Sequence, residues 1–233
     1  MKIEIWSDVV CPWCYIGKRR FESALGQFAH RDDVQVVWRS FELDPGSQRR
    51  SPGTLDELLA RKLGRSTEQA AAMNAHVSAL AAKEGLDYHL DRAQHGNTFD
   101  AHRLIHLAER HGLQAEAKER LLKAYFTEGA AIGDAEALAA LADELGLPAD
   151  EVRETLAGTA FADEVRADER RAQALGISGV PAFVINERYL ISGAQEPQVL
   201  LSALEQIWAE SHPLTPLATP AGAGMCDDES CAV

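Results

Sequence analysis

Cysteine, basic residues and long apolar runs are all scarce in this chain. Its 233 residues include only four cysteines, too few for the disulfide framework that holds small secreted domains together. No run of about 18 apolar residues occurs, which argues against a membrane-spanning helix. Lysine and arginine total 23 against 36 acidic residues, for a formal net charge of −13. Nucleic acid is recognised by clustered basic side chains, so we expect neither nucleic-acid nor membrane partners.

The amino-terminal segment lacks the features of a secretion signal. Residues 1–6 have no basic stretch, no apolar core of signal length and no small-residue cleavage site. We therefore expect a cytoplasmic protein. Apolar residues make up 46% of the chain, enough for the core of one large domain or of two closely associated ones.

The first 45 residues predict a β-α-β unit. Residues 2–7 alternate apolar and polar side chains as a strand does, and residues 12–28 place apolar side chains at near-helical spacing. Residues 34–43 are rich in β-branched and aromatic side chains and end at a turn signal, Asp-Pro-Gly. We expect two strands joined by a helix.

The middle of the chain is helical in composition. Between residues 54 and 175, alanine, leucine, glutamate, lysine and arginine dominate, and glycines mark the breaks. The segment has room for six or seven helices. Ser66 and Gln69 stand at the spacing of a capping box, which would open one of them.

After the helical segment, the pattern returns to strands. Residues 182–185 and 189–191 are short apolar runs that predict a hairpin, and residues 195–208 predict a closing helix. From residue 212 the composition is that of a flexible linker. The linker ends at Cys226 and Cys231, which four residues separate.

Cys11 and Cys14 form a CPWC motif between a predicted strand and a predicted helix. A thiolate is the nucleophile of disulfide exchange, and a second thiol nearby must resolve the mixed disulfide. The unpaired amides at a helix start stabilise negative charge, so we expect a lowered pKa for Cys11. We predict Cys11 as the attacking nucleophile and Cys14, one turn later, as the resolving thiol.

Zinc binding is the alternative for this motif. Two cysteines at this spacing are common zinc ligands, and a structural site needs four ligands. Cys226 and Cys231 supply the other two only if the linker folds back. The strand before the motif and the helix after it favour redox chemistry. We expect no metal and no cofactor.

Residues 7–17 (SDVVCPWCYIG) and residues 179–184 (GVPAFV) resemble DsbA-like thioredoxin-fold oxidoreductases, most closely the cytosolic FrnE-type branch. The resemblance covers the chain from residue 1 to about 211. It implies an α/β thioredoxin fold with a mixed sheet and a large inserted all-helical domain. The predicted units are a thioredoxin-like domain (1–53 and 166–211), a helical insertion (54–165) and a flexible tail with a Cys-x4-Cys motif (212–233).

The resemblance also implies substrate-binding residues. It implies that Val180 and Pro181 form a cis peptide bond that faces the cysteines and presents the backbone of Val180 to a peptide. Pro12 and Trp13, between the cysteines, would border the same groove. Without the CPWC motif, Pro181 could equally be a proline at the entry to a strand.

His102 and His106 lie within or beside a second stretch that resembles the FrnE-type pattern, residues 97–104. The resemblance suggests that this helix start borders the active site, with His102 among the substrate-binding residues. The two histidines are four residues apart on one helical face and could ligate a metal. No acidic ligand pattern accompanies them, so packing or groove lining is favoured.

Cys226 and Cys231 bracket three acidic residues. Such surroundings raise thiol pKa values and slow nucleophilic attack. We predict an accessory redox pair that the main pair reduces or oxidises. The alternative is a disordered tail with incidental cysteines.

Taken together, these features predict a thiol-disulfide oxidoreductase that works through a mixed disulfide. Its partners would be protein or small-molecule thiols and disulfides, among them glutathione. The alternative is a glutathione-dependent isomerase or transferase of the chromene-carboxylate isomerase or kappa type, whose members typically carry serine where this chain has Cys11. A third hypothesis is a non-catalytic binding module. The direction of exchange, as oxidase, reductase or isomerase, does not follow from the sequence.

Overall fold

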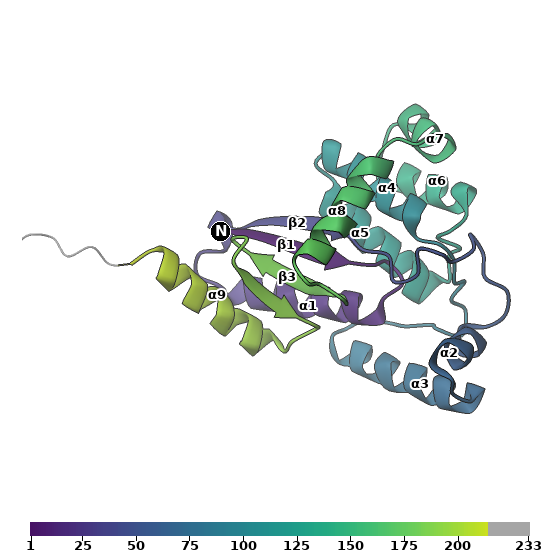
Figure 1. The fold of residues 1–233 in the computed structure, drawn as a ribbon, viewed down its shortest axis with the longest axis horizontal. Coiled ribbons are helices and arrows are strands. Elements are labelled where there is room, and N and C mark those ends of the chain that lie inside the picture. The colour runs from purple at the N-terminus through teal and green to yellow at the C-terminus, as the bar shows by residue number, and fades with distance from the viewer. Residues whose placement is uncertain (214–233) are drawn as a thin grey trace, which may run out of the picture.

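The computed structural model of the protein describes residues 1–213. Four strands form one mixed sheet in the order β2-β1-β3-β4 (Figure 1). β1 pairs with β2 in parallel and with β3 antiparallel, and β4 pairs antiparallel with β3. The strands are β1 (Lys2–Ser7), β2 (Gln35–Ser40), β3 (Ala182–Ile185) and β4 (Tyr189–Ser192). Each lies within or close to the segment predicted for it.

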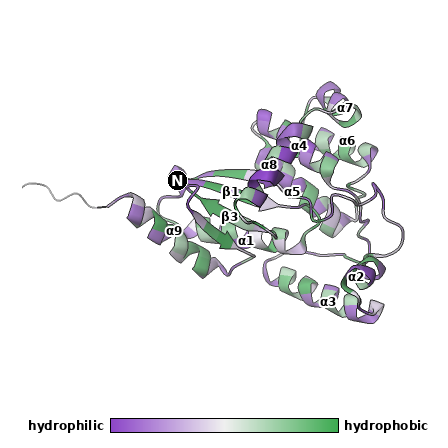
Figure 2. Ribbon diagram, viewed as in Figure 1, coloured by the Kyte–Doolittle hydropathy of each residue, from purple (hydrophilic) through white to green (hydrophobic). Residues whose placement is uncertain are grey.

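Helices cover both faces of the sheet because successive side chains of β1 point to opposite sides. Ile3 and Ile5 are buried in a core shared with α1 (Pro12–Gln27) and α9 (Pro197–Ser211). Trp6 faces the other way, and its indole donates a 2.9 Å hydrogen bond to the carbonyl of Asp168 in α8 (Ala162–Ala174). Figure 2 shows the apolar strands between more polar helices.

Seven helices lie between β2 and β3, which confirms the predicted six or seven. Figure 1 shows the α2–α3 hairpin standing apart from the group α4 to α8. A short π-helical segment (Ala124–Glu128) follows α5. The helices are α2 (Leu55–Leu63), α3 (Thr67–Lys83), α4 (Phe99–Arg110), α5 (Gln114–Lys123), α6 (Ala135–Glu144), α7 (Ala149–Ala157) and α8.

The predicted capping box is present at the start of α3. The Gln69 amide donates to the Ser66 hydroxyl at 3.2 Å, and the Ser66 amide donates to the Gln69 side chain at 3.1 Å. Thr54 and Glu57 form a second capping box at the start of α2. Both boxes satisfy amides that have no partner within the helix.

The sheet and its helices confirm the predicted fold class, an α/β thioredoxin fold with a mixed sheet and an inserted helical segment. The domain boundary predicted between residues 165 and 166 falls inside α8, and the division into domains stays a prediction. Within residues 1–213 no helix is both long and apolar enough to cross a membrane. Cys226 and Cys231 lie outside the described residues.

Candidate active site

The structure places Cys11 and Cys14 at the start of α1, directly after β1. Cys11 is the N-cap residue with an extended backbone, and Pro12 occupies the first helical position. Proline suits this position because its missing N–H has no partner inside the helix. Both cysteines are free thiols and buried, with 4% of Cys11 and 1% of Cys14 exposed. Of the two residues, Cys11 is the more accessible.

Cys11 faces the loop that precedes β3. Its thiol donates a 3.5 Å hydrogen bond to the carbonyl oxygen of Val180. The Val180–Pro181 peptide bond is cis, as the resemblance implied. The fold therefore brings together two segments of the chain that lie 169 residues apart, and both belong to the predicted site.

The carboxylate of Asp8 lies at the floor of the site. It accepts hydrogen bonds from the Val9 amide at 2.7 Å and from the Leu43 amide at 2.8 Å. The Nε2 atom of His102 lies 3.2 Å from its Oδ1 atom. Burial alone would raise the pKa of Asp8, but the hydrogen bonds from His102 and Leu43 outweigh it and lower the pKa. Asp8 is thus a buried, ionised group beneath the cysteines.

His102 and His106 bind different partners. His102 is 1% exposed and contacts Asp8, so it supports the floor of the site and does not reach its surface. The role predicted for it, substrate contact, does not fit this burial. The Nε2 atom of His106 lies 3.1 Å from the Ser40 hydroxyl and 3.2 Å from Asp168. Because serine and aspartate face the same ring nitrogen, the arrangement is no Ser-His-Asp triad.

The two thiols titrate as a pair, because two thiolates in contact cannot both ionise readily. Their hydrogen bond, followed by burial, raises the pKa of Cys11, and the charge of Asp8 adds to the effect. The lowered pKa expected for Cys11 is therefore not found. Burial also opposes ionisation of Cys14, but the bond from Cys11 and the charge of Lys118 outweigh it and lower the pKa of Cys14. The negative charge of the pair rests closer to Cys14.

A ring from the loop between α3 and α4 holds the cysteine motif in place. The Tyr88 hydroxyl donates a 2.8 Å hydrogen bond to the carbonyl oxygen of Pro12. Tyr88 stacks on Phe126 with 4.5 Å between ring centroids, and it also stacks on Tyr15 of α1. The insertion is thereby packed directly against the turn that carries Cys11.

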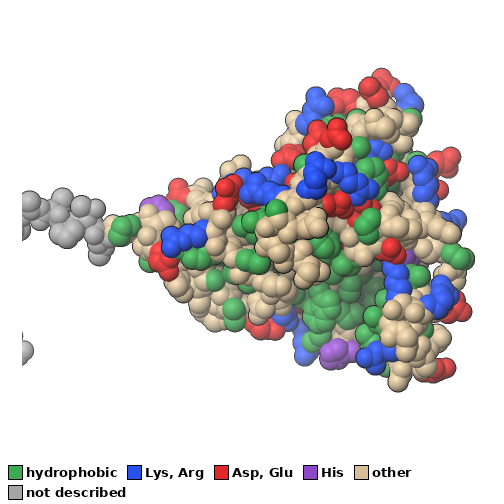
Figure 3. Space-filling model, viewed as in Figure 1, with side chains coloured by type: hydrophobic (Ala, Val, Ile, Leu, Met, Phe, Trp, Pro, Cys, Tyr) green, Lys and Arg blue, Asp and Glu red, His purple; other side chains and the backbone are tan. Residues whose placement is uncertain are grey.

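An apolar groove begins at the cysteine motif. Pro12 and Trp13 form one wall, and side chains of α2 and α3 form the other around a hollow of about 480 Å³. Trp13 is 41% exposed, and Met73 of α3 is similarly exposed. Figure 3 shows hydrophobic side chains gathered at a hollow in this part of the surface. The remaining lining residues are Leu59, Ala72, Asn74, His76 and Val77.

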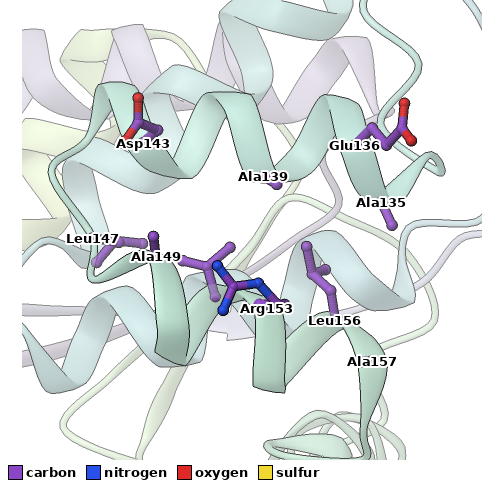
Figure 4. Close-up of a pocket in the computed structure, with 10 residues that line it drawn as sticks. Ala135, Glu136, Ala139, Asp143, Leu147, Ala149, Arg153, Leu156 and Ala157 are labelled. Atoms are coloured by element: carbon purple, nitrogen blue, oxygen red, sulfur yellow. The ribbon is translucent and has the colours of Figure 1, made fainter.

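A second apolar hollow lies between α6 and α7 (Figure 4). Ala139 of α6 and Leu156 of α7 point into it, while Asp143 points away. Its lining includes no cysteine or histidine, so we regard it as a gap in helix packing. Among residues 1–213, no three His, Cys, Asp or Glu side chains group closely enough to hold a metal ion.

Residues 2–205 match the family of the DSBA-like thioredoxin domain. The chain belongs to this family. A probable DsbA oxidoreductase from Streptomyces coelicolor shares 47% sequence identity and a TM-score of 0.87 with it, over 100% of this chain and 99% of that protein.

Two further proteins are similar to this DSBA-like chain, one in sequence and the other in fold. The uncharacterized protein YwbO of Bacillus subtilis (strain 168) is 29% identical over 204 residues, 87% of this chain and 94% of YwbO. The cytosolic disulfide reductase DsbM of Pseudomonas aeruginosa is 18% identical, with a TM-score of 0.64 over 90% of this chain and 100% of DsbM. At this identity, DsbM shows the shared fold alone.

Four residues of the DSBA-like site were given no role by sequence reasoning: Ser7, Asp8, Tyr88 and Lys118. Ser7 and Asp8 shortly precede the cysteine motif, and a buried polar pair at the end of an apolar strand is a signal that could have identified them. Tyr88 and Lys118 come from the helical segment. Nothing in its helical pattern marks which side chains face the cysteines.

Proposed function

We propose that the protein is a thiol-disulfide oxidoreductase in which Cys11 attacks and Cys14 resolves. The observation that carries this proposal is the Cys11 thiol at the start of α1, facing the carbonyl of Val180 beside a cis proline. Two thiols in contact can cycle through an internal disulfide, which a glutathione-activating site does not need. The free thiols of the structure correspond to the reduced state.

The exchange reaction conserves electrons and protons. In the singly ionised pair, Cys11 passes its proton to the Cys14 thiolate, and the resulting Cys11 thiolate attacks one sulfur of a substrate disulfide. The other substrate sulfur leaves as a thiolate and takes up a proton. Cys14 then loses its proton and attacks the Cys11 sulfur, which forms the Cys11–Cys14 bond and releases the second substrate sulfur as a thiolate. The enzyme loses two electrons and the substrate gains them, and the same steps in reverse oxidise a dithiol.

We propose a polypeptide as the main substrate. The backbone of Val180 lies beside Cys11, where an extended peptide can pair with it. The apolar groove that begins at Pro12 and Trp13 suits large apolar side chains next to the substrate cysteine. Glutathione is a smaller candidate that would fill only part of this surface. The DsbM structure with GSH describes that protein, and glutathione is therefore included in the test.

We propose a place in the cytosolic FrnE-type branch, on the strength of residues 7–17 and 97–104. In the structure these two stretches meet, because Asp8 of the first contacts His102 of the second. A cytoplasmic location is part of the same proposal, which a fluorescent fusion viewed in the native host would test.

The decisive experiment measures turnover on a disulfide-bonded polypeptide and on glutathione disulfide, with the Cys11→Ser/Cys14→Ser double variant as control. We expect the wild type to reduce the polypeptide when supplied with a dithiol, and the double variant to be inactive. Polypeptide binding that survives in the double variant, with no disulfide turnover by either protein, would instead identify a binding module. Turnover of an aromatic substrate that requires glutathione and persists in Cys14→Ser would favour the isomerase or transferase alternative.

A further inference from the structure

Lys118 is a buried lysine whose charge acts on both thiols of the cysteine pair. It extends from α5, is 1% exposed, and donates a 3.0 Å hydrogen bond to the carbonyl oxygen of Ser7. Its ammonium group also lies 5.8 Å from the centre of the Trp38 ring. The titratable groups that act on it come from the motif, α1, the end of β1 and α4, namely Cys11, Cys14, Lys18, Asp8 and His102.

Within the described chain, Lys118 has no carboxylate partner within ion-pair distance. Lys18, the other buried lysine near the site, lies 2.5 Å from Glu22 and 2.6 Å from Glu119. Asp8 attracts Lys118 through its charge but forms no ion pair with it, and its oxygens accept from two amides and contact His102. A buried charge without a partner is unfavourable. An anion that forms close to Lys118 in one state of the protein would therefore stabilise its buried ammonium group.

A second buried donor points to where that anion forms. The Ser7 hydroxyl is fully buried and has no hydrogen-bond partner among the described residues. Lys118 and Ser7 both favour the charged form of Cys14. The hydroxyl and the ammonium group thus converge on the same thiol.

We propose that Lys118 is the positioning residue that stabilises the Cys14 thiolate, with the Ser7 hydroxyl as a second donor, in the step that releases a trapped substrate. This proposal rests on the proposed function. In the mixed disulfide, the Cys14 thiol gives its proton to solvent or to the leaving thiolate of the first step. The Cys14 thiolate then attacks the Cys11 sulfur, the bond from Cys11 to the substrate breaks, and the substrate sulfur leaves with the electron pair. Lys118 acts through its charge and transfers no proton in this step; burial lowers its pKa to about 8, so the charge is present below that pH.

The expected effect follows from two opposing trends. Removal of an opposite charge a few ångströms away moves the midpoint of a thiol titration upward by about 1–3 pH units. For each pH unit by which the midpoint rises, the thiolate fraction at a pH below the midpoint falls about tenfold. The thiolate of higher pKa is also a stronger nucleophile, which raises the rate again by about threefold. Loss of the Lys118 charge should therefore slow the release step about three- to fourfold for each pH unit by which the Cys14 midpoint rises. The first attack, by Cys11, draws on the same singly ionised pair, so its pH midpoint should also rise, while its rate above that midpoint should change little.

The test separates the two steps by stopped-flow absorbance. Reduced protein opens an aromatic disulfide whose thiolate product is coloured, so Cys11 releases one equivalent and Cys14 then releases the second. Rates of both phases are measured against pH in wild type, Lys118→Met, Lys118→Arg and the control Lys18→Met. We expect the second phase of Lys118→Met to move to higher pH and its reduction potential to become more negative. Lys118→Arg keeps the charge and should stay near wild type, as should Lys18→Met.

A second phase in folded Lys118→Met with the wild-type rate and pH midpoint overturns the proposal. An equal change in Lys118→Arg or in Lys18→Met also overturns it, because packing or general charge would then explain the effect. If neither Lys118 variant folds, the thiolate absorbance of Cys14 is titrated against pH in Cys11→Ser. A midpoint at or above about 8.5 contradicts the proposal, and a lower midpoint supports it. If the wild type shows no first phase, in which Cys11 opens the aromatic disulfide, the proposed function is contradicted. The titration of Cys14 in Cys11→Ser would still test the effect of Lys118 on the Cys14 thiolate.

Discussion

Gly17 lies so close to the ring of Pro181 that a Cβ atom added at Gly17 would stand 2.8 Å from the Pro181 Cγ atom. Gly17 is on α1, and Pro181 follows the residue whose carbonyl faces Cys11. The missing side chain therefore sets how closely the helix of the cysteines approaches the cis-proline loop.

Replacement of Gly17 by alanine should displace the cis-proline loop from the cysteines. We expect a loss of about 1–3 kcal/mol in the free energy of unfolding, as for other overpacked sites, together with slower disulfide exchange. Gly26→Ala is a matched control, because Gly26 lies on the same helix with nothing within 4 Å of an added Cβ atom. Urea unfolding and turnover of a small disulfide measure both effects. Equal behaviour of the two variants would show that the Gly17–Pro181 contact is not tight.

Cys14→Ser should trap substrates as mixed disulfides. The first attack needs only Cys11, whereas release needs the second thiol. Non-reducing gels and mass mapping should show substrate bound to Cys11 in this variant and none bound in Cys11→Ser. The opposite pattern would reverse the roles of the two cysteines.

The protein should lose stability as the pH falls below about 6.5, partly through His102. Burial lowers the pKa of His102 more than the neighbouring Asp8 raises it. Below the pKa of about 6.5 in the unfolded chain, that chain binds a proton that the folded chain does not, so acid favours unfolding. His102→Gln should be less stable at pH 7 by about 1–3 kcal/mol but should lose less between about pH 6.5 and 5.

Urea unfolding at several pH values measures this difference. His76→Gln, at an exposed position of α3, is the control and should keep the wild-type slope of stability against pH. If His102→Gln also keeps that slope, the buried contact with Asp8 does not account for the acid sensitivity.

The apolar groove should matter for polypeptides and not for small disulfides. Met73→Asp places a charge in the groove wall, away from the cysteines. We expect the KM for an apolar polypeptide disulfide to rise about tenfold, equivalent to about 1.4 kcal/mol of binding, with no change for a small aromatic disulfide. Leu190→Asp, at an exposed position of β4 outside the groove, is the control. An equal effect of the two variants on polypeptide turnover would argue against the groove.

The prediction for Cys226 and Cys231 comes from the sequence. The Cys226→Ser/Cys231→Ser variant should keep exchange with small disulfides, because the CPWC motif is intact, but should alter how fast the main pair is reset. In a Cys14→Ser protein, mass mapping should find a disulfide from Cys11 to one of the two within the same chain. One tightly held zinc per chain, lost with either cysteine pair and found without such a cross-link, would establish the metal alternative.

The sequence by itself determined the local chemistry of this protein. Adjacent residues are enough to predict the CPWC motif, the strand before it and the helix after it, because the spacing of apolar side chains is a local property of the sequence. The Ser66–Gln69 capping box could be predicted for the same reason. Pro181 was identified through a short motif, and its place opposite Cys11 needed the resemblance to known folds.

Only the tertiary structure decided which side chains surround the thiols. Tyr88 reaches Pro12 across 76 residues and Lys118 reaches Ser7 across 111. The spacing of apolar residues in a helix indicates which face is buried, but it does not indicate which residues pack against that face. The lowered pKa expected for Cys11 was inferred from the helix start alone. It was wrong because the fold brings other titratable groups close to this thiol, and they raise its pKa. Asp8 and the Cys14 sulfur oppose a charge on Cys11, while Lys118 and Ser7 favour one on Cys14.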